Sequence, residues 1–294
     1  MLLPSDFISH IKNNLSATLG KKVQINKVEK VSGGSVNESY KLSTNATPFF
    51  IKVNSEKKFP GLFESEEKGL THLKENSEFH IPEVLLRGNF NDYGYLILPY
   101  LERGDTNQIF WNQFAENLAG LHQNNAEYFG LEMDNYNGSV IQFNSKKLRW
   151  ADFFVENRLM IQCKLARDEK KVDKAFISQI EKIYPKIEHL FPVEKPSLLH
   201  GDLWSGNYMA SKNGEAVIFD PAVYYGHREV DIAMSLLFGG FDKQLYKRYN
   251  DVFPLEAGWE SRVDIANLYP LLVHVNLFGA SYAKRVKQVI KPFV

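Results

Sequence analysis

The sequence predicts an α+β protein of two lobes, in which an N-terminal antiparallel sheet with one helix precedes a mainly helical C-terminal lobe. From residue 23 to about residue 101, short β-rich runs such as FFIKVN and YGYLILPYL are separated by Gly, Asn and Asp. After residue 101, apolar residues recur at the spacing of amphipathic helices. We therefore place the N-terminal lobe at residues 1–100 and the C-terminal lobe at residues 101–294, joined near residues 98–102.

One helix is predicted within the β-rich half. In LFESEEKGLTHLKE, the residues Leu62, Glu66, Leu70 and Leu73 fall on one helical face. A carboxylate on a buried face needs a cationic partner, because an unpaired buried charge is strongly unfavourable.

Three apolar stripes predict helices in the second half. The third stripe contains Pro185, which should kink that helix or end it early because proline lacks a backbone N–H and clashes with the preceding turn. A β-hairpin and a loop are expected between residues 197 and 220. The stripes comprise Phe110, Phe114, Leu118 and Leu121, then Trp150, Phe154, Ile161 and Leu165, then Val172, Phe176, Ile180, Ile183, Ile187 and Leu190.

Composition and charge limit the classes of partner. The 294 residues are 44% hydrophobic and 24% charged, as in an ordinary globular protein. Lys plus Arg and Asp plus Glu number 35 each, so no net basic field would attract nucleic acid or an anionic membrane. The single Cys163 and the lack of a secretory signal favour a cytoplasmic protein. His274 and Asn276 interrupt the apolar run LYPLLVHVNLFGA, which favours a buried helix over a membrane span.

The segment LLHGDLWSGN carries the strongest chemical signal. Asp202 follows His200 by two positions and precedes Asn207 by five. The catalytic loop of kinases, H-x-D-x-x-x-x-N, has this spacing, and there the Asp accepts the proton of the attacking hydroxyl while the Asn binds a metal ion. An isolated Asp202 would more simply be a loop cap. We expect His200 to orient the loop by hydrogen bonding rather than to react.

A hairpin signal beyond this loop predicts a second metal ligand. Asn213 and Gly214 stand between two β-prone runs and favour a two-residue turn. Such a turn places Asn207 directly opposite Asp220, with Cβ atoms about 5 Å apart. Two oxygen ligands at that separation can share one Mg²⁺.

Upstream signals are weaker when each is taken alone. Gly33, Gly34 and Ser35 lie between two predicted strands, where glycines let backbone amides approach phosphates, although a plain hairpin turn has the same composition. Lys52 in FFIKVN could be an exposed strand lysine, but Glu66 on a buried face favours the Lys–Glu pair that positions the ATP-binding lysine in kinases. Motifs for zinc hydrolases, P-loops and serine hydrolases are absent from the sequence.

Together these blocks make the chain resemble the fructosamine kinase (ketosamine kinase) family, relatives of the aminoglycoside and choline kinases. The resemblance extends from about Val31 to Lys287 and implies the bilobal protein-kinase-like fold. Its most specific features are Trp204 after the catalytic Asp, the triplet Asp220-Pro221-Ala222 and the run from Tyr224 to Asp231. The matching blocks are VSGGSVNESYKL, FFIKVN, LFESEEKGL, LLHGDLWSGNYM, VIFDPAVYYGHREVDIAMSLLFGGF and NLYPLLVHVNLFG.

The resemblance implies ATP and Mg²⁺ as cofactors and assigns residues to each. Asp202 is then the proton acceptor, and Asn207 and Asp220 bind Mg²⁺. Lys52 contacts the ATP phosphates and pairs with Glu66. The residues that cover the phosphates are Gly33, Gly34 and Ser35, and those of the hinge that holds adenine are Leu98, Pro99, Tyr100 and Leu101.

Some positions depart from the family pattern or have support roles. Pro99 stands where an acid is frequent, yet proline keeps the carbonyl that adenine needs. Ser35 stands where some members have a cysteine, so thiol regulation is not expected there. His200 and Trp204 are predicted to support the substrate or the loop. Arg228, Glu229 and Asp231 are predicted to brace the loop, Asp231 by direct contact, with helix capping as the alternative.

The implied reaction is ATP-dependent phosphorylation of the third-carbon hydroxyl of a ketoamine, a fructosamine or ribulosamine in small-molecule or protein-bound form. The product is labile and releases the amine, so the expected role is deglycation. Alternatives are a kinase for another alcohol or amine such as an aminoglycoside, choline or a free sugar, a nucleotide-binding pseudokinase scaffold, and a non-catalytic binder of glycated ligands. No residue of the catalytic set is missing, which weighs against the last two. A monomer is favoured.

Overall fold

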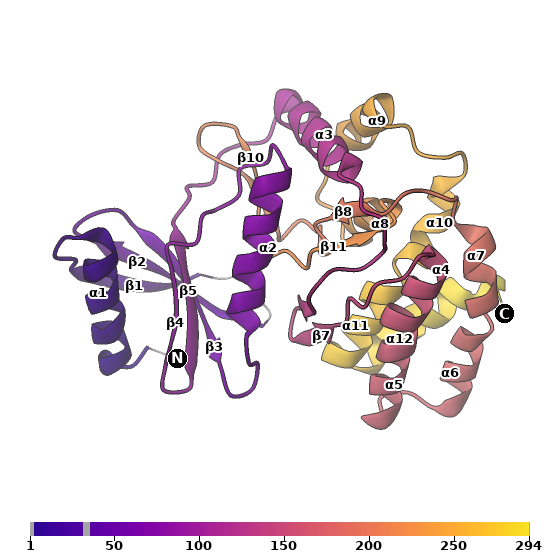
Figure 1. Ribbon diagram of the computed structural model, residues 1–294, viewed down its shortest axis with the longest axis horizontal. Coiled ribbons are helices and arrows are strands. Elements are labelled where there is room, and N and C mark those ends of the chain that lie inside the picture. Colours follow the sequence, from indigo (N-terminus) through magenta and orange to yellow (C-terminus); the bar gives the residue numbers. More distant parts are fainter. Residues whose placement is uncertain (1–2, 32–35, 294) are drawn as a thin grey trace.

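The computed structural model describes residues 3–31 and 36–293. Figure 1 shows a sheet lobe and a helical lobe side by side, with the N-terminus in the first and the C-terminus in the second. The predicted α+β bilobal architecture is therefore confirmed, while the division between residues 100 and 101 stays a prediction. Gly33, Gly34 and Ser35 lie outside the described residues, so their predicted contact with phosphates also stays a prediction.

The N-terminal lobe is a five-stranded antiparallel sheet in the order β1-β2-β3-β5-β4. Successive side chains of a strand point to opposite faces, so Ile97 of β5 packs in the cluster around helix α1 whereas Leu96 packs in the cluster around helix α2. Figure 1 shows α2 between the sheet and the helical lobe. The elements are α1 (Ser5–Leu19), β1 (Ile25–Val31), β2 (Glu38–Thr44), β3 (Phe49–Ser55), α2 (Leu62–Asn76), β4 (Leu86–Phe90) and β5 (Tyr93–Pro99).

Helix α2 is the helix predicted inside the β-rich half. All four residues of its expected stripe, including Glu66, are buried. Helix α1 was not predicted from the sequence. Its buried residues Phe7, Ile11 and Leu15 recur every fourth position, and Gly20 ends it with a left-handed φ of 62°. In its described residues the N-terminal lobe therefore has two helices, one on each face of the sheet, where the sequence predicted one.

The C-terminal lobe is mainly helical and contains three short two-stranded sheets. The predicted effect of Pro185 is confirmed, because α6 ends at Glu181 and Pro185 lies in a 3₁₀ turn. The elements are α3 (Gln108–Gln123), β6 (Asn135–Asn137), β7 (Val140–Gln142), α4 (Trp150–Phe153), a π-helical turn (Phe154–Leu159), α5 (Met160–Asp168), α6 (Lys174–Glu181), a 3₁₀ turn (Tyr184–Lys186), α7 (Ile187–Leu190), β8 (Ser197–Leu199), β9 (Tyr208–Ala210), β10 (Ala216–Ile218), β11 (Tyr224–Gly226), α8 (Glu229–Leu237), α9 (Lys243–Val252), α10 (Trp259–Ala266), α11 (Leu268–Phe278), α12 (Ala280–Ile290) and a final 3₁₀ turn (Lys291–Phe293).

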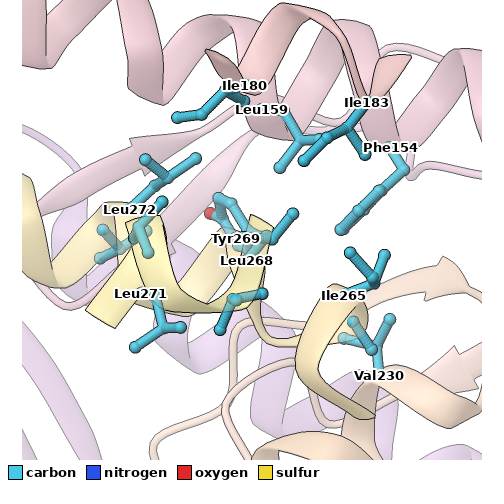
Figure 2. Packing of buried hydrophobic residues seen from close by; sticks show 14 of the residues in the cluster. Phe154, Leu159, Ile180, Ile183, Val230, Ile265, Leu268, Tyr269, Leu271 and Leu272 are labelled. Carbon is cyan, nitrogen blue, oxygen red and sulfur yellow. The ribbon is translucent and has the colours of Figure 1, made fainter. Parts of the chain in front are cut away.

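Helix α11 lies at the centre of this lobe, as the apolar run LYPLLVHVNLFGA predicted. Figure 2 shows its side chains surrounded by residues from the π-helical turn, α6, α8 and α10. Within the described part of the chain, no helix has both the length and the apolar composition needed to cross a bilayer. The labelled residues of this core are Phe154, Leu159, Ile180, Ile183, Val230, Ile265, Leu268, Tyr269, Leu271 and Leu272.

The hairpin of β9 and β10 forms, but its predicted register is wrong by one residue. Ile218 pairs with Tyr208, and Ala216 pairs with Ala210. The turn holds three residues rather than two, because the Ser211 N–H donates to Glu215 O at 2.9 Å and Gly214 adopts a left-handed φ of 83°. A turn with a left-handed glycine in the last position is the usual three-residue hairpin, and it shifts the pairing by one.

The α11 core predicts a large effect of a single truncation. Leu272 is fully buried, so Leu272→Ala should lower the free energy of unfolding by about 2–5 kcal/mol through lost burial and the cavity left behind. Leu148 is 71% exposed, and Leu148→Ala should change it by less than about 0.5 kcal/mol. Chemical denaturation of both variants measures the difference, and equal effects would contradict the packing described.

Candidate active site

A cleft of about 720 Å³ lies between the lobes and brings most of the predicted site residues together. The sheet lobe and the loops around β9 and β10 both contribute to its walls. His200 and Asp231 are fully buried and support this loop region from inside the C-terminal lobe. The predicted residues that line the cleft are Lys52, Glu66, Leu98, Pro99, Tyr100, Leu101, Asp202, Trp204, Asn207 and Asp220.

Lys52 places a buried cation in the wall of the cleft. Alternation along β3 turns Ile51 toward α1, so the Lys52 side chain points to the opposite face, which α2 covers. Lys52 Nζ donates to Glu66 Oε1 at 2.6 Å and forms a second ion pair with Asp220. Lys52 is only 3% exposed, which excludes the interpretation of this residue as an exposed strand lysine. The expected ion pair is thus present, and its role toward ATP stays a prediction.

Asn207 holds the carboxylate of Asp202. Its side-chain Nδ2 donates to Asp202 Oδ2 at 2.9 Å and to the Asp202 backbone carbonyl at 2.9 Å. These two bonds join the ends of the loop and fix the direction of the carboxylate. The base and the amide predicted from the sequence spacing therefore lie side by side at the cleft.

The surroundings of Asp202 change its acidity. Burial raises the pKa of the Asp202 carboxyl from its ordinary value of 3.8 to about 7, although the hydrogen bond from Asn207 opposes the rise. The negative charge of Asp231 adds to the increase. A carboxyl whose pKa lies near neutrality is suited to take up a proton during a reaction.

Asp220 reaches the cleft by a route that differs from the predicted one. In the actual register Phe219 stands opposite Asn207, and its N–H donates to Asn207 O at 3.1 Å. Asp220 then adopts a left-handed φ of 56°, a conformation that Asp tolerates better than most residues other than Gly. This turn brings its carboxylate to Lys52 and its backbone carbonyl to 3.4 Å from Asn207 Nδ2.

The oxygen atoms at Asn207 and Asp220 suit Mg²⁺. Because Asn207 Nδ2 is directed at Asp202 oxygens, its carbonyl Oδ1 is the atom left for a cation. Asp220, whose backbone carbonyl lies 3.4 Å from Asn207 Nδ2, supplies a carboxylate to the same cleft. Among the described residues, no three His, Cys, Asp or Glu side chains cluster into a complete protein cage for a metal. Mg²⁺ is usually held by one or two protein ligands together with waters and phosphates, so this donor set fits an ion that arrives with a nucleotide.

Asp231 braces the catalytic loop by direct contact, as predicted. Its two carboxylate oxygens accept the backbone N–H of His200 at 2.7 Å and of Gly201 at 3.0 Å. The side chains of Arg228 and Glu229 pair with Glu194 and Arg262, so a bracing role for these two stays a prediction. The capping alternative fails for Arg228, which makes no side-chain capping bond to α8.

His200 orients the loop, as predicted. Its Nε2 lies 3.0 Å from Phe219 O, and its Nδ1 lies 3.3 Å from the Asp202 backbone N–H. Burial lowers the pKa of His200, so the ring is neutral and can donate through Nε2 while it accepts through Nδ1. Trp204 lines the cleft two residues after Asp202, and its support of a substrate stays a prediction.

The predicted hinge, residues 98–101, comprises the last two residues of strand β5 and the two that follow it. Tyr100 donates its backbone N–H to Pro48 O at 3.2 Å, and its ring lies 4.2 Å from Lys41 Nζ. Pro99 has no N–H to donate. The next backbone N–H beyond Tyr100 is that of Leu101, and the binding of adenine by this segment stays a prediction.

The sequence did not point to the hairpin of β6 and β7, which supports the site. Buried Gln142 donates through Nε2 to Ala222 O at 2.9 Å and accepts the Tyr269 hydroxyl at 2.9 Å. Tyr136 lines the cleft, and its hydroxyl donates to Pro60 O at 3.0 Å in the other lobe. The dipeptide Asn137-Gly138 is a hairpin signal that could have located the strands, though not their partners.

Comparisons with known proteins identify the family of this chain. A model of the fructosamine kinase family matches residues 7–294. A probable ketoamine kinase from Enterococcus faecium is 40% identical over 273 residues, which cover 91% of this chain and 95% of that protein. The chloroplastic protein-ribulosamine 3-kinase of Arabidopsis thaliana is 38% identical over 286 residues, which cover 94% of this chain and 85% of that protein.

Solved structures agree at the level of the fold. The crystal structure of a candidate fructosamine-3-kinase from Haemophilus somnus has a TM-score of 0.84 and 31% identity, with 97% of this chain and 96% of that chain covered. The aminoglycoside phosphotransferase APH(4)-Ia has a TM-score of 0.63 at 14% identity, with 98% of this chain and 99% of that chain covered. The protein-kinase-like fold is therefore established for this chain.

The brace at Asp231 predicts a local change in the loop. In Asp231→Asn one acceptor oxygen becomes an NH₂ group that faces a backbone N–H donor, so the free energy of unfolding should fall by about 1–3 kcal/mol. The amides of His200 and Gly201 should exchange with deuterium faster than in the wild type. Asp264→Asn, at an exposed position of α10, serves as the control. Unchanged exchange of the two amides would contradict the bracing role.

Proposed function

The chain belongs to the fructosamine kinase family, and we propose on this premise that it transfers the γ-phosphoryl group of ATP to the third-carbon hydroxyl of a ketoamine. The observation that carries the proposal is the joint placement of the Lys52–Glu66 pair, the Asp202–Asn207 pair and Asp220 at one cleft. Phosphoryl transfer needs such an arrangement, because catalysis rests on positioning and on neutralising phosphate charge.

Asp202 acts as the base in the proposed reaction. Its carboxylate accepts the proton of the substrate hydroxyl while the hydroxyl oxygen bonds to the γ-phosphorus and the bond to the ADP oxygen breaks. Asn207 keeps the carboxylate aimed at the cleft through the 2.9 Å hydrogen bond to Oδ2. Because the pKa of Asp202 is about 7, the ionised form that this step requires is well populated at neutral pH.

The nucleotide is held by groups of both lobes. Lys52 would neutralise ATP phosphates while Glu66 keeps it in place, and Gly33, Gly34 and Ser35 would cover the phosphates. The hinge would bind adenine through the Pro99 carbonyl and the Leu101 N–H. Mg²⁺, held by Asn207 and Asp220, would neutralise negative charge on the phosphates.

The substrate assignment is drawn from the family. The Arabidopsis relative is named as a protein-ribulosamine 3-kinase and the Enterococcus relative as a ketoamine kinase, which supports a ribulosamine or fructosamine, and deglycation as the cellular role. The cytoplasmic location and the monomeric state stay predictions. A screen of ATP consumption with ribuloselysine, fructoselysine, choline and an aminoglycoside tests the choice. Turnover of choline or the aminoglycoside alone would contradict the ketoamine proposal.

The metal proposal predicts the effect of removing one carboxylate. Asp220→Ala should lose Mg²⁺-dependent turnover, because Asn207 alone offers one neutral oxygen where the metal needs a carboxylate. The rise in melting temperature that Mg²⁺ adds in the presence of ATP should also disappear. Asp251→Ala, at an exposed position of α9, is the matched control. Mg²⁺-dependent activity near that of the wild type would exclude Asp220 as a ligand.

Binding and chemistry should separate at Asp202. In Asp202→Asn the amide can still hydrogen-bond the hydroxyl but cannot take its proton, so turnover of ribuloselysine should fall about 10²–10⁴-fold. Binding of Mg²⁺ and ATP should persist, because other residues hold them. Calorimetry with ATP and a coupled assay measure the two properties. Loss of ATP binding would make Asp202 a metal ligand or a structural cap, and retained turnover would exclude it as the base.

A further inference from the structure

A continuous row of aromatic side chains leads away from the catalytic loop. We call Trp204, Phe238, His274, Phe278 and Tyr282 the aromatic strip. The ring centroids of Trp204 and Phe238 are 6.0 Å apart, and those of Phe238 and His274 are 5.2 Å apart. His274 lies 5.3 Å from Phe278 and 4.9 Å from Tyr282. Each ring thus contacts the next, although the residues belong to the catalytic loop, α11, α12 and the end of α8.

The strip is open to solvent at two of its rings. Phe238 is 40% exposed and Phe278 is 50% exposed, whereas the apolar side chains at the centre of α11 are buried. Burial lowers the pKa of His274, so the ring is neutral near pH 7 and would not repel a cationic ligand. Exposed apolar side chains that adjoin one another commonly mark an interaction surface, unlike isolated ones.

One end of the strip belongs to the cleft. Trp204 lines the cleft with Asp202, the proposed base. The C-terminal end of α11 also lies close to the β6–β7 turn. Gly138 of this turn lines the cleft, and a Cβ placed on it would lie 3.5 Å from Leu277 Cδ1. The C-terminal end of α11 therefore flanks the cleft mouth, and the strip continues from the cleft to the outer surface.

We propose that the aromatic strip binds the amine-bearing half of a ketoamine whose amine is a lysine side chain of a peptide or protein. This inference rests on the proposed function. When the third-carbon hydroxyl meets Asp202, the sugar occupies the cleft, and the amine on the first carbon of the sugar continues out of it. Aromatic faces bind both the methylene stem of a lysine and its protonated nitrogen. A strip that ends in half-exposed rings suits a chain that continues into solvent.

Two adducts that share one sugar test the proposal. The first is ribulose joined to the lysine of a short Nα-acetylated peptide, and the second is ribulose joined to methylamine. For Phe278→Ala and for Phe238→Ala, the ratio of kcat/KM between peptide and methylamine adducts should fall about tenfold, mainly through a higher KM for the peptide adduct. Val252→Ala, with 37% exposure on α9, is the control and should keep the wild-type ratio.

The outcomes distinguish this inference from the proposed function. If both adducts lose activity equally, the rings support the catalytic loop rather than the amine, and the proposal is wrong. An unchanged ratio in both variants also overturns it. If wild-type protein phosphorylates neither adduct, the ketoamine function itself fails, and the role of the strip fails with it. Melting temperatures of the two variants, one at the residue after α8 and the other at the end of α11, verify that a change in the ratio does not come from unfolding.

Discussion

The buried ammonium group of Lys52 is the constraint on which the relation of the two lobes depends. A cation with 3% exposure is tolerated only beside charged partners, and here one partner, Glu66, lies on α2 while the other, Asp220, lies in the helical lobe. Helix α2 also rests on Pro221, because Gly69 leaves room where a Cβ would come within 3.2 Å of its ring. The ion pairs of Lys52 and the packing of α2 on Pro221 therefore both hold the sheet lobe and the helical lobe at a fixed separation across the cleft.

A second set of buried groups, on α8 and β7 of the C-terminal lobe, fixes the catalytic loop. Asp231 on α8 accepts two backbone N–H groups of the loop, and Gln142 on β7 donates to Ala222 O. The Ala222 N–H donates in turn to His200 O at 2.9 Å, so the segments before Asp202 and after Asp220 are joined through their backbones. This rigidity matters because phosphoryl transfer depends on holding the base and the phosphate in a fixed relative position.

Local patterns were enough to predict the lobes, the α2 stripe, the break near Pro185 and the Lys52–Glu66 pair. Each depends on residues within one helix or strand, or on the general requirement that a buried acid find a cation. The same holds for the spacing of Asp202 and Asn207, because a separation of five positions allows the amide to reach back to the carboxylate. The apolar residues Phe7, Ile11 and Leu15 of α1 form an equally local pattern. This helix could therefore have been predicted from the sequence.

Other features depend on distant segments or on a single choice of turn. Gln142 and Tyr136 hydrogen-bond to residues far away in the sequence, and no local pattern predicts which backbone atoms they will contact. The Asn213-Gly214 signal permits a turn of two or of three residues, and the wrong choice moved the predicted partner of Asn207 by one position. Asp220 nevertheless stands beside Asn207, because its left-handed φ turns the chain back to the cleft. What the site requires is the position of a carboxylate, and the backbone can supply that position from more than one register.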